Sequence, residues 1–63
     1  MTEYFVLEVA PMDCSFTGPF GSQVEAHYWI DSHESDNDFE IMTRSQMEAN
    51  IAKYGEAVVQ TPQ

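Results

Sequence analysis

The feature that most constrains this chain is that 63 residues with a single cysteine must fold without an internal disulfide. Cys14, His27 and His33 also lack the spacing of a structural zinc site. A domain of this size buries a limited core and is only marginally stable. Stability must therefore come from efficient packing, from oligomerisation or from binding to a partner. We expect one domain spanning residues 1–63, with no metal and no cofactor.

Short apolar runs predict strands in the first two thirds of the chain. Residues 3–9 are aromatic and β-branched, which is typical of a strand. Residues 23–31 alternate between apolar and polar side chains, which predicts a strand with one buried face. Residues 39–42 are expected to pair back on that second strand as a hairpin, with Phe39 and Ile41 facing the core.

The clearest local signals bracket a helix near the C-terminus. Thr43 and Gln46 form a capping-box pattern, Ser45 and Glu48 offer a second register for it, and Gly55 stands where a helix commonly ends. Apolar residues between them follow helical spacing: Met47, Ile51 and Tyr54. Residues 56–61 then predict a short last strand. The expected fold is α+β in the order β-β-β-α-β, a small antiparallel sheet with one helix packed on one face.

The aromatic residues in the middle of the chain allow two interpretations. Residues 11–22 are rich in turn formers and predict a long connection that carries Phe16 and Phe20. These two rings either fold onto the core as a lid or stay exposed for contact with a partner. Trp29 falls on the polar side of its predicted strand, where the same loop covers it or where it anchors an interface.

The net charge of −9 lies entirely in the first two thirds of the chain. Residues 1–43 contain no Lys or Arg, whereas the charges of residues 44–63 sum to zero. Five carboxylates fall close together in the sequence: Asp31, Glu34, Asp36, Asp38 and Glu40. In an extended segment the last three project to one side, roughly 7 Å apart. Two basic residues cannot neutralise a phosphate track, so direct binding of nucleic acid is excluded.

Three interpretations of this acidic run compete. It is a solubilising surface, a cation site, or a row of carboxylates that imitates phosphates before a basic groove. The calcium-loop pattern is incomplete, because the glycine and the terminal bidentate Glu of such loops are missing. Enzymatic activity is not expected, because Cys14, His27 and His33 have no activating cation nearby and so short a chain offers little cleft.

The sequence also bears on location. The first residues lack the basic and apolar regions of a secretory signal, and no run approaches the roughly 20 apolar residues of a membrane span. A single free cysteine fits a reducing cytoplasm.

In its length, its segment 1–43 without Lys or Arg, and its acidic run, the chain resembles small phage anti-defence proteins. These include anti-CRISPR proteins and DNA-mimicking anti-restriction proteins. The resemblance lies in whole-chain features, so no residue's role is carried over from it. It implies a non-enzymatic inhibitor that occupies the basic nucleic-acid-binding surface of a defence effector in a bacterial host cell.

The residues predicted to bind this partner are Glu25, Trp29, Asp31, Glu34, Asp36, Asp38 and Glu40. The alternative is a structural or adaptor module that docks through apolar or edge-strand contacts, its acids serving solubility only. A homodimer that buries Trp29 and the aromatic loop is compatible with either function. The salt dependence of binding distinguishes the two functions, because the affinity of a charge mimic falls steeply with ionic strength and that of an apolar contact does not.

Overall fold

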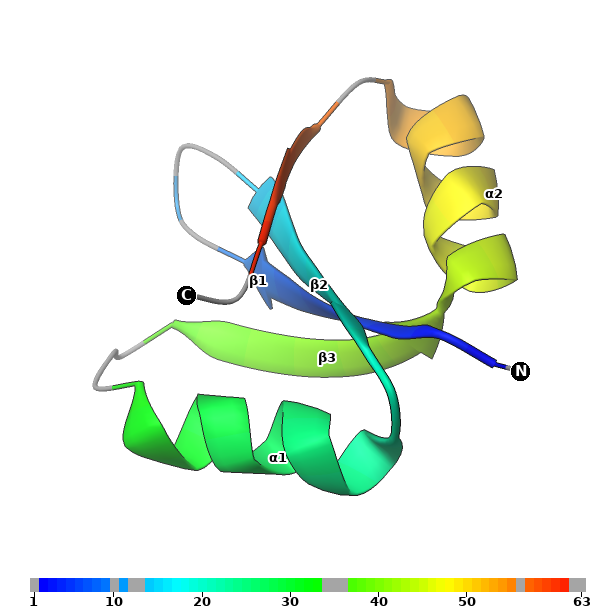
Figure 1. Cartoon of the computed structure of the whole chain (residues 1–63). Helices are drawn as coiled ribbons and strands as arrows, with labels where there is room; N and C mark the ends of the chain where they lie inside the picture. The colour runs from blue at the N-terminus through cyan, green and yellow to red at the C-terminus, as the bar shows by residue number, and fades with distance from the viewer. Residues whose placement is uncertain (1, 10, 12–13, 34–36, 56, 62–63) are drawn as a thin grey trace.

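Within the described residues, four strands form one mixed sheet with a helix on each face (Figure 1). The computed structural model describes residues 2–9, 11, 14–33, 37–55 and 57–61. The elements in chain order are β1 (Tyr4–Val9), β2 (Cys14–Phe20), α1 (Gln23–Ser32), β3 (Asp38–Thr43), α2 (Arg44–Tyr54) and β4 (Val58–Gln60). Neither helix of this part of the chain is long and apolar enough to cross a membrane.

The sheet has the order β3-β1-β2-β4, which makes β3 and β4 its two edges. β1 pairs antiparallel with both β2 and β3, whereas β4 runs parallel to β2. The predicted α+β class is confirmed, but the purely antiparallel sheet with one helix is wrong. The observed order is β-β-α-β-α-β, and the segment from α1 to α2 supplies the long connection that a parallel pair requires.

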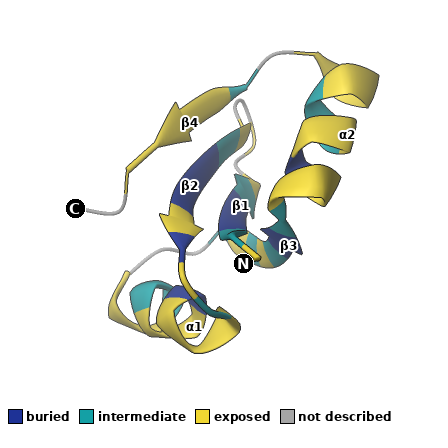
Figure 2. Cartoon of the chain, turned by 45° about the vertical axis from the view of Figure 1, so that its right-hand side comes forward, coloured by how far each residue is buried: buried dark blue, intermediate teal, exposed yellow. Residues whose placement is uncertain are grey.

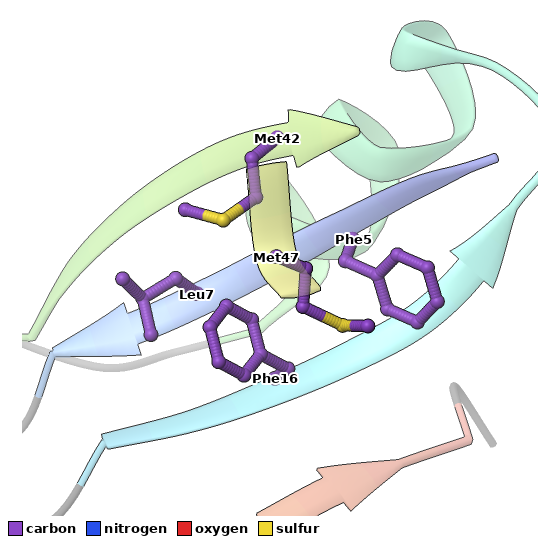
Figure 3. Packing of buried hydrophobic residues seen from close by; sticks show 5 residues of the cluster. All are labelled: Phe5, Leu7, Phe16, Met42 and Met47. Atoms are coloured by element: carbon purple, nitrogen blue, oxygen red, sulfur yellow. The ribbon is translucent and has the colours of Figure 1, made fainter. Parts of the chain in front are cut away.

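β1 is buried on both faces of the sheet. Phe5 and Leu7 lie on the side of α2, and Val6 lies on the side of α1. The α2 side holds one cluster of buried side chains (Figure 3): Phe5, Leu7, Phe16, Met42 and Met47. The α1 side holds a second cluster, in which partly buried side chains surround Val6, Phe20 and Ala26. The strand predicted over residues 3–9 is therefore confirmed, and it is the centre of the fold.

The predicted long connection over residues 11–22 is wrong over most of its described length, because residues 14–20 form β2. Pairing with β1 overrides the turn-forming residues of this segment. Two steps along β1, from Tyr4 to Val6, match three steps along β2, from Phe20 to Thr17. This extra residue reverses the alternation of β2, so that Phe16 and Phe20 are buried on opposite faces of the sheet. Phe16 and Phe20 are therefore buried in the core, as the first of the two interpretations expected, but they belong to a strand and not to a loop that covers the core.

The strand predicted over residues 23–31 is also wrong, because this segment is α1. Ser22 is the N-cap, and its Oγ accepts a hydrogen bond from the Glu25 backbone N–H at 3.3 Å. Helical spacing places Ala26, Trp29 and Ile30 against the sheet. Val24 and Tyr28, expected on the buried face of a strand, are 63% and 71% exposed.

β3 confirms the strand predicted over residues 39–42 but not its partner, since it pairs with β1 and not with the segment before it. Phe39 and Ile41 are partly buried and pack against the α1-side cluster, as expected. Met42 points to the other face and joins the α2-side cluster. A hairpin with residues 23–31 cannot form, because those residues fold as α1.

α2 has the predicted boundaries. The Gln46 backbone N–H donates to Thr43 Oγ1 at 3.2 Å, and the Thr43 backbone N–H donates to Gln46 Oε1 at 2.9 Å. Gly55 ends the helix with a φ of 98°, a left-handed value that favours glycine. Its N–H donates to the Ile51 carbonyl at 2.8 Å. The predicted last strand is confirmed at Val58–Gln60.

Replacing Thr43 with Ala removes the side-chain half of this capping box. We expect Thr43→Ala to lower the free energy of unfolding by about 1 kcal/mol, since the Gln46 N–H loses its acceptor. Ser45→Ala is the matched control, because Ser45 is an exposed hydroxyl inside the first turn of the same helix. Urea denaturation followed by circular dichroism measures both, and equal losses in the two variants would contradict the assigned cap.

Candidate functional site

The structure places the described members of the predicted site on α1 and β3. Glu25, Trp29 and Asp31 belong to α1, while Asp38 and Glu40 belong to β3. Glu34 and Asp36 lie outside the described residues. The four described carboxyl residues are all exposed, and Trp29 is partly buried.

Asp31 and Asp38 are brought to the same end of the α1–β3 pair. The Trp29 and Phe39 rings meet edge to face at 5.9 Å between centroids, and the His33 ring lies 5.8 Å from Phe39. These contacts hold the last turn of α1 against the start of β3, where the two aspartates are exposed. Asp31, near the end of α1, and Asp38, at the start of β3, therefore lie at the same end of this pair of elements.

Asp38 and Glu40 share one face of β3, as their period-2 spacing predicts. They alternate with Phe39 and Ile41, which pack towards α1, so both carboxylates lie on the α2 side of the sheet. Asp31 lies on the α1 side. The three carboxylates therefore flank the edge strand β3 from two sides and do not form one flat row. We call Asp31, Asp38 and Glu40 the acidic edge.

Glu25 stands apart from the acidic edge. It lies six residues before Asp31 on α1, about 9 Å away along the helix axis. Its Oε2 accepts a hydrogen bond from the Gly21 backbone N–H at 2.8 Å. Together with Ser22 this contact closes the first turn of α1. The sequence Ser22-Gln-Val-Glu25 carries the capping-box signature, so the helix start was readable from the sequence.

Trp29 packs inside the fold. Its ring stacks on His33 at 4.6 Å between centroids and lies 6.2 Å from the Phe20 ring. With Phe39 edge-on, three aromatic side chains surround the indole. The indole is therefore covered by side chains of β2, β3 and the end of α1, and the tryptophan packs α1 against the sheet.

One polar cluster at this end has no counterpart in the sequence predictions. Glu8 of β1 accepts a hydrogen bond from Asn37 Nδ2 at 2.8 Å, and its other carboxylate oxygen lies 3.9 Å from His33 Nε2. Glu8 also stands opposite Phe39 in the β1–β3 register. These contacts tie β1 to the two ends of the segment between α1 and β3. No local pattern signals them, because they join residues about 29 positions apart.

Both basic side chains of the protein lie on α2. Arg44 Nε donates to Glu3 Oε1 at 2.6 Å, and this hydrogen bond raises the pKa of Arg44 above its ordinary value. The Arg44 guanidinium also lies 5.1 Å from the centre of the Phe5 ring, and Lys53 Nζ lies 5.2 Å from the Tyr54 ring. Since residues 1–43 contain no Lys or Arg, the acidic edge has no basic side chain on its own elements.

A second surface, on the α2 side, is apolar. A groove of about 830 Å³ runs between the C-terminal end of α2 and β4. Its apolar walls come from Leu7, Phe16, Tyr54 and Val58, and none of its described lining residues is charged. Figure 2 shows that β4, next to this groove, is exposed along its whole length. We call this surface the apolar groove.

The candidate catalytic and metal-binding residues are not gathered into a site. Cys14 is exposed at the start of β2 and lines the apolar groove, whereas His27 and His33 belong to α1 and its C-cap on the opposite side of the sheet. Across the residues that the structure describes, no group of three or more His, Cys, Asp or Glu side chains could hold a metal ion.

No protein-family model, curated protein or solved structure matches this chain.

Proposed function

We propose that this protein is a non-enzymatic inhibitor that binds the basic nucleic-acid-binding surface of a larger protein, a defence effector in the cytoplasm of a bacterial host. The observation that carries the proposal is the separation of charge across the fold. Exposed carboxylates line α1 and β3, while Arg44 and Lys53 lie on α2. Arg44 is already paired with Glu3.

The carboxylates of the acidic edge lie on both faces of the sheet beside β3, and neither α1 nor β3 carries a Lys or Arg to neutralise them. Grooves that hold nucleic acid are lined by Lys and Arg, and opposite potentials accelerate encounter and fix orientation. The acidic edge presents its carboxylates on a paired strand and a capped helix, so their positions are set before binding. Preorganised charges bind at a lower entropic cost than charges on a loose segment.

The proposal is tested by reversing charge on the acidic edge. Asp38→Lys with Glu40→Lys changes the net charge by +4 at two exposed positions of β3. The immobilised protein is exposed to nuclease-treated bacterial lysate and eluted with rising salt. We expect the wild type to retain a nucleic-acid-binding protein that double-stranded DNA competes away. In the variant we expect retention to fall by about tenfold or more, equivalent to 1.4 kcal/mol.

The matched control makes the same change of charge on α2. Glu48→Lys, Ala49→Lys and Ala52→Lys together add +4 at exposed helix positions, so a general effect of net charge would lower binding equally. If binding depends on the acidic edge itself, this control should retain the partner about as well as the wild type does. Elution of the wild type should also require only a moderate increase from about 0.15 M salt, because the Debye length shrinks from about 8 Å to about 3 Å by 1 M. Retention that is indifferent to salt and to the β3 reversal would refute the proposal.

A further inference from the structure

The side of α1 that faces away from the sheet carries apolar side chains that the fold leaves uncovered (Figure 2). Ala26 and Ile30 pack against the sheet. Helical spacing places Val24 and Tyr28 on the opposite side of α1, where they are 63% and 71% exposed. Asp31 continues the same line three positions after Tyr28 and is also exposed. We call Val24, Tyr28 and Asp31 the outer stripe of α1.

Charge indicates what kind of surface can cover the outer stripe. The stripe ends on Asp31, Glu25 lies three positions before Tyr28, and α1 carries no Lys or Arg. An acidic partner would be repelled, and a neutral one would bury these carboxylates without a counter-charge, which costs free energy. A basic partner avoids both penalties. The exposed valines of β4 give no such indication, because no described residue lining the groove beside them is charged.

We propose that the outer stripe binds an arginine side chain of a basic partner, with the guanidinium stacked on the Tyr28 ring and paired with the Asp31 carboxylate. The inference rests on the proposed function and names the chemistry by which the same side of the molecule recognises its partner. Residues three apart on a helix have their Cβ atoms about 5–6 Å from each other, so one planar guanidinium reaches both groups. A lysine ammonium is compact and strongly hydrated, and it cannot stack in this way.

Tyr28 supplies a contact that the acidic edge lacks. Carboxylates at an exposed surface attract any cation, and salt screens that attraction. A ring face adds a contact that favours a flat cation, and tyrosine is common among the residues that dominate binding energy at interfaces. Trp29 cannot take this role, because its indole is surrounded by Phe20, His33 and Phe39. The interface anchor that the sequence places at Trp29 is therefore assigned to its exposed neighbour.

Two peptides of equal charge, octa-arginine and octa-lysine, test the proposal. Isotope-labelled protein is titrated with each peptide at about 0.05 M salt, where screening is weak, and the shifts of the backbone amides give the Kd. We expect the wild type to bind octa-arginine more tightly, with its largest shifts on α1. In Tyr28→Ala the affinity for octa-arginine should fall about two- to fivefold, as the loss of an exposed cation–π contact of about 0.5–1 kcal/mol implies. The affinity for octa-lysine should change less, so the preference for arginine falls.

Tyr54→Ala is the matched control, because Tyr54 is a tyrosine that is 72% exposed on α2, with Lys53 Nζ 5.2 Å from its ring. It should bind both peptides like the wild type. Tyr28→Phe keeps the ring and should keep the preference for arginine. An unchanged preference in Tyr28→Ala, or an equal loss in Tyr54→Ala, overturns the proposal.

Retention from lysate separates a failure of this inference from a failure of the proposed function. If Tyr28→Ala retains the partner like the wild type while Asp38→Lys with Glu40→Lys does not, the arginine contact is wrong and the proposed function stands. If retention by the wild type is indifferent to salt and to the β3 reversal, the proposed function is refuted. The peptide titrations then decide on their own whether the outer stripe binds a guanidinium.

Discussion

Phe5→Ala is expected to remove a large share of the free energy of unfolding, about 3–5 kcal/mol. Phe5 is 2% exposed and lies in the α2-side cluster with Leu7, Phe16, Met42 and Met47 (Figure 3). Removing a fully buried aromatic ring costs about 3–5 kcal/mol, from lost transfer free energy and the cavity that remains. At 0.05–0.15 kcal/mol per residue, 63 residues provide only about 3–9 kcal/mol of total stability. One substitution therefore removes a large share of it.

Tyr28→Ala is the control for this prediction, because Tyr28 is an aromatic residue that is 71% exposed on α1. Its free energy of unfolding should stay within about 0.5 kcal/mol of the wild type. Dispersion of amide proton resonances reports the folded fraction, and urea denaturation gives the free energy where a transition is measurable. A Phe5→Ala protein as stable as Tyr28→Ala would show that the α2-side cluster does not carry the fold.

Among Gly→Ala substitutions in this protein, Gly18→Ala is expected to lower the free energy of unfolding the most. A Cβ at Gly18 would lie 2.6 Å from Phe5 Cδ2 and 2.9 Å from the carbonyl oxygen of Tyr4. The second contact is with backbone of the paired strand, so the strands must move apart to relieve it. This happens where the β1–β2 register shifts and where Phe20 is turned to the α1 side. Overpacking of this kind costs about 1–3 kcal/mol.

Gly21→Ala is the matched control for Gly18→Ala. Its nearest neighbour would be Glu25 Oε2 at 3.1 Å, the far end of a flexible side chain that can give way. We expect a change within about 0.5 kcal/mol in thermal or urea unfolding. Comparable losses at the two glycines would contradict the close approach of β2 to β1 at Gly18.

Binding of a basic partner by the acidic edge weakens as ionic strength rises. Reversing Asp38 and Glu40 should lower this binding by about tenfold or more.

The burial of Phe16 and Phe20 removes one form of the adaptor interpretation, in which these rings are exposed for docking. Phe16 and Phe20 are 1% and 6% exposed, so neither offers a surface to a partner in the folded protein. The edge-strand form of that interpretation retains one structural basis, the exposed β4. In that form, an extended peptide from a partner would add a strand beside β4.

The sequence by itself determined the elements whose signals are local. The capping box of Thr43 and Gln46, the terminal Gly55 and the compact apolar run of β1 each involve residues within a few positions of one another. The distribution of charge was equally readable, because it needs only the count of residues in each segment. Such features survive in the structure since no distant contact competes with them.

Tertiary structure decided the identity of β2 and the partners of every strand, and it settled α1 as a helix, for which the sequence held one local signal, the capping signature of Ser22 and Glu25. Local propensities differ by less than about 1 kcal/mol per residue, whereas burying one large apolar side chain contributes about 1.5–3 kcal/mol. Pairing with β1 therefore makes a strand of a segment rich in turn formers, and burial of Ala26, Trp29 and Ile30 makes a helix of an alternating segment. The placement of Asp31 on one face of the sheet and of Asp38 and Glu40 on the other follows from the folding of residues 23–32 as a helix, which the alternating pattern of the sequence did not predict.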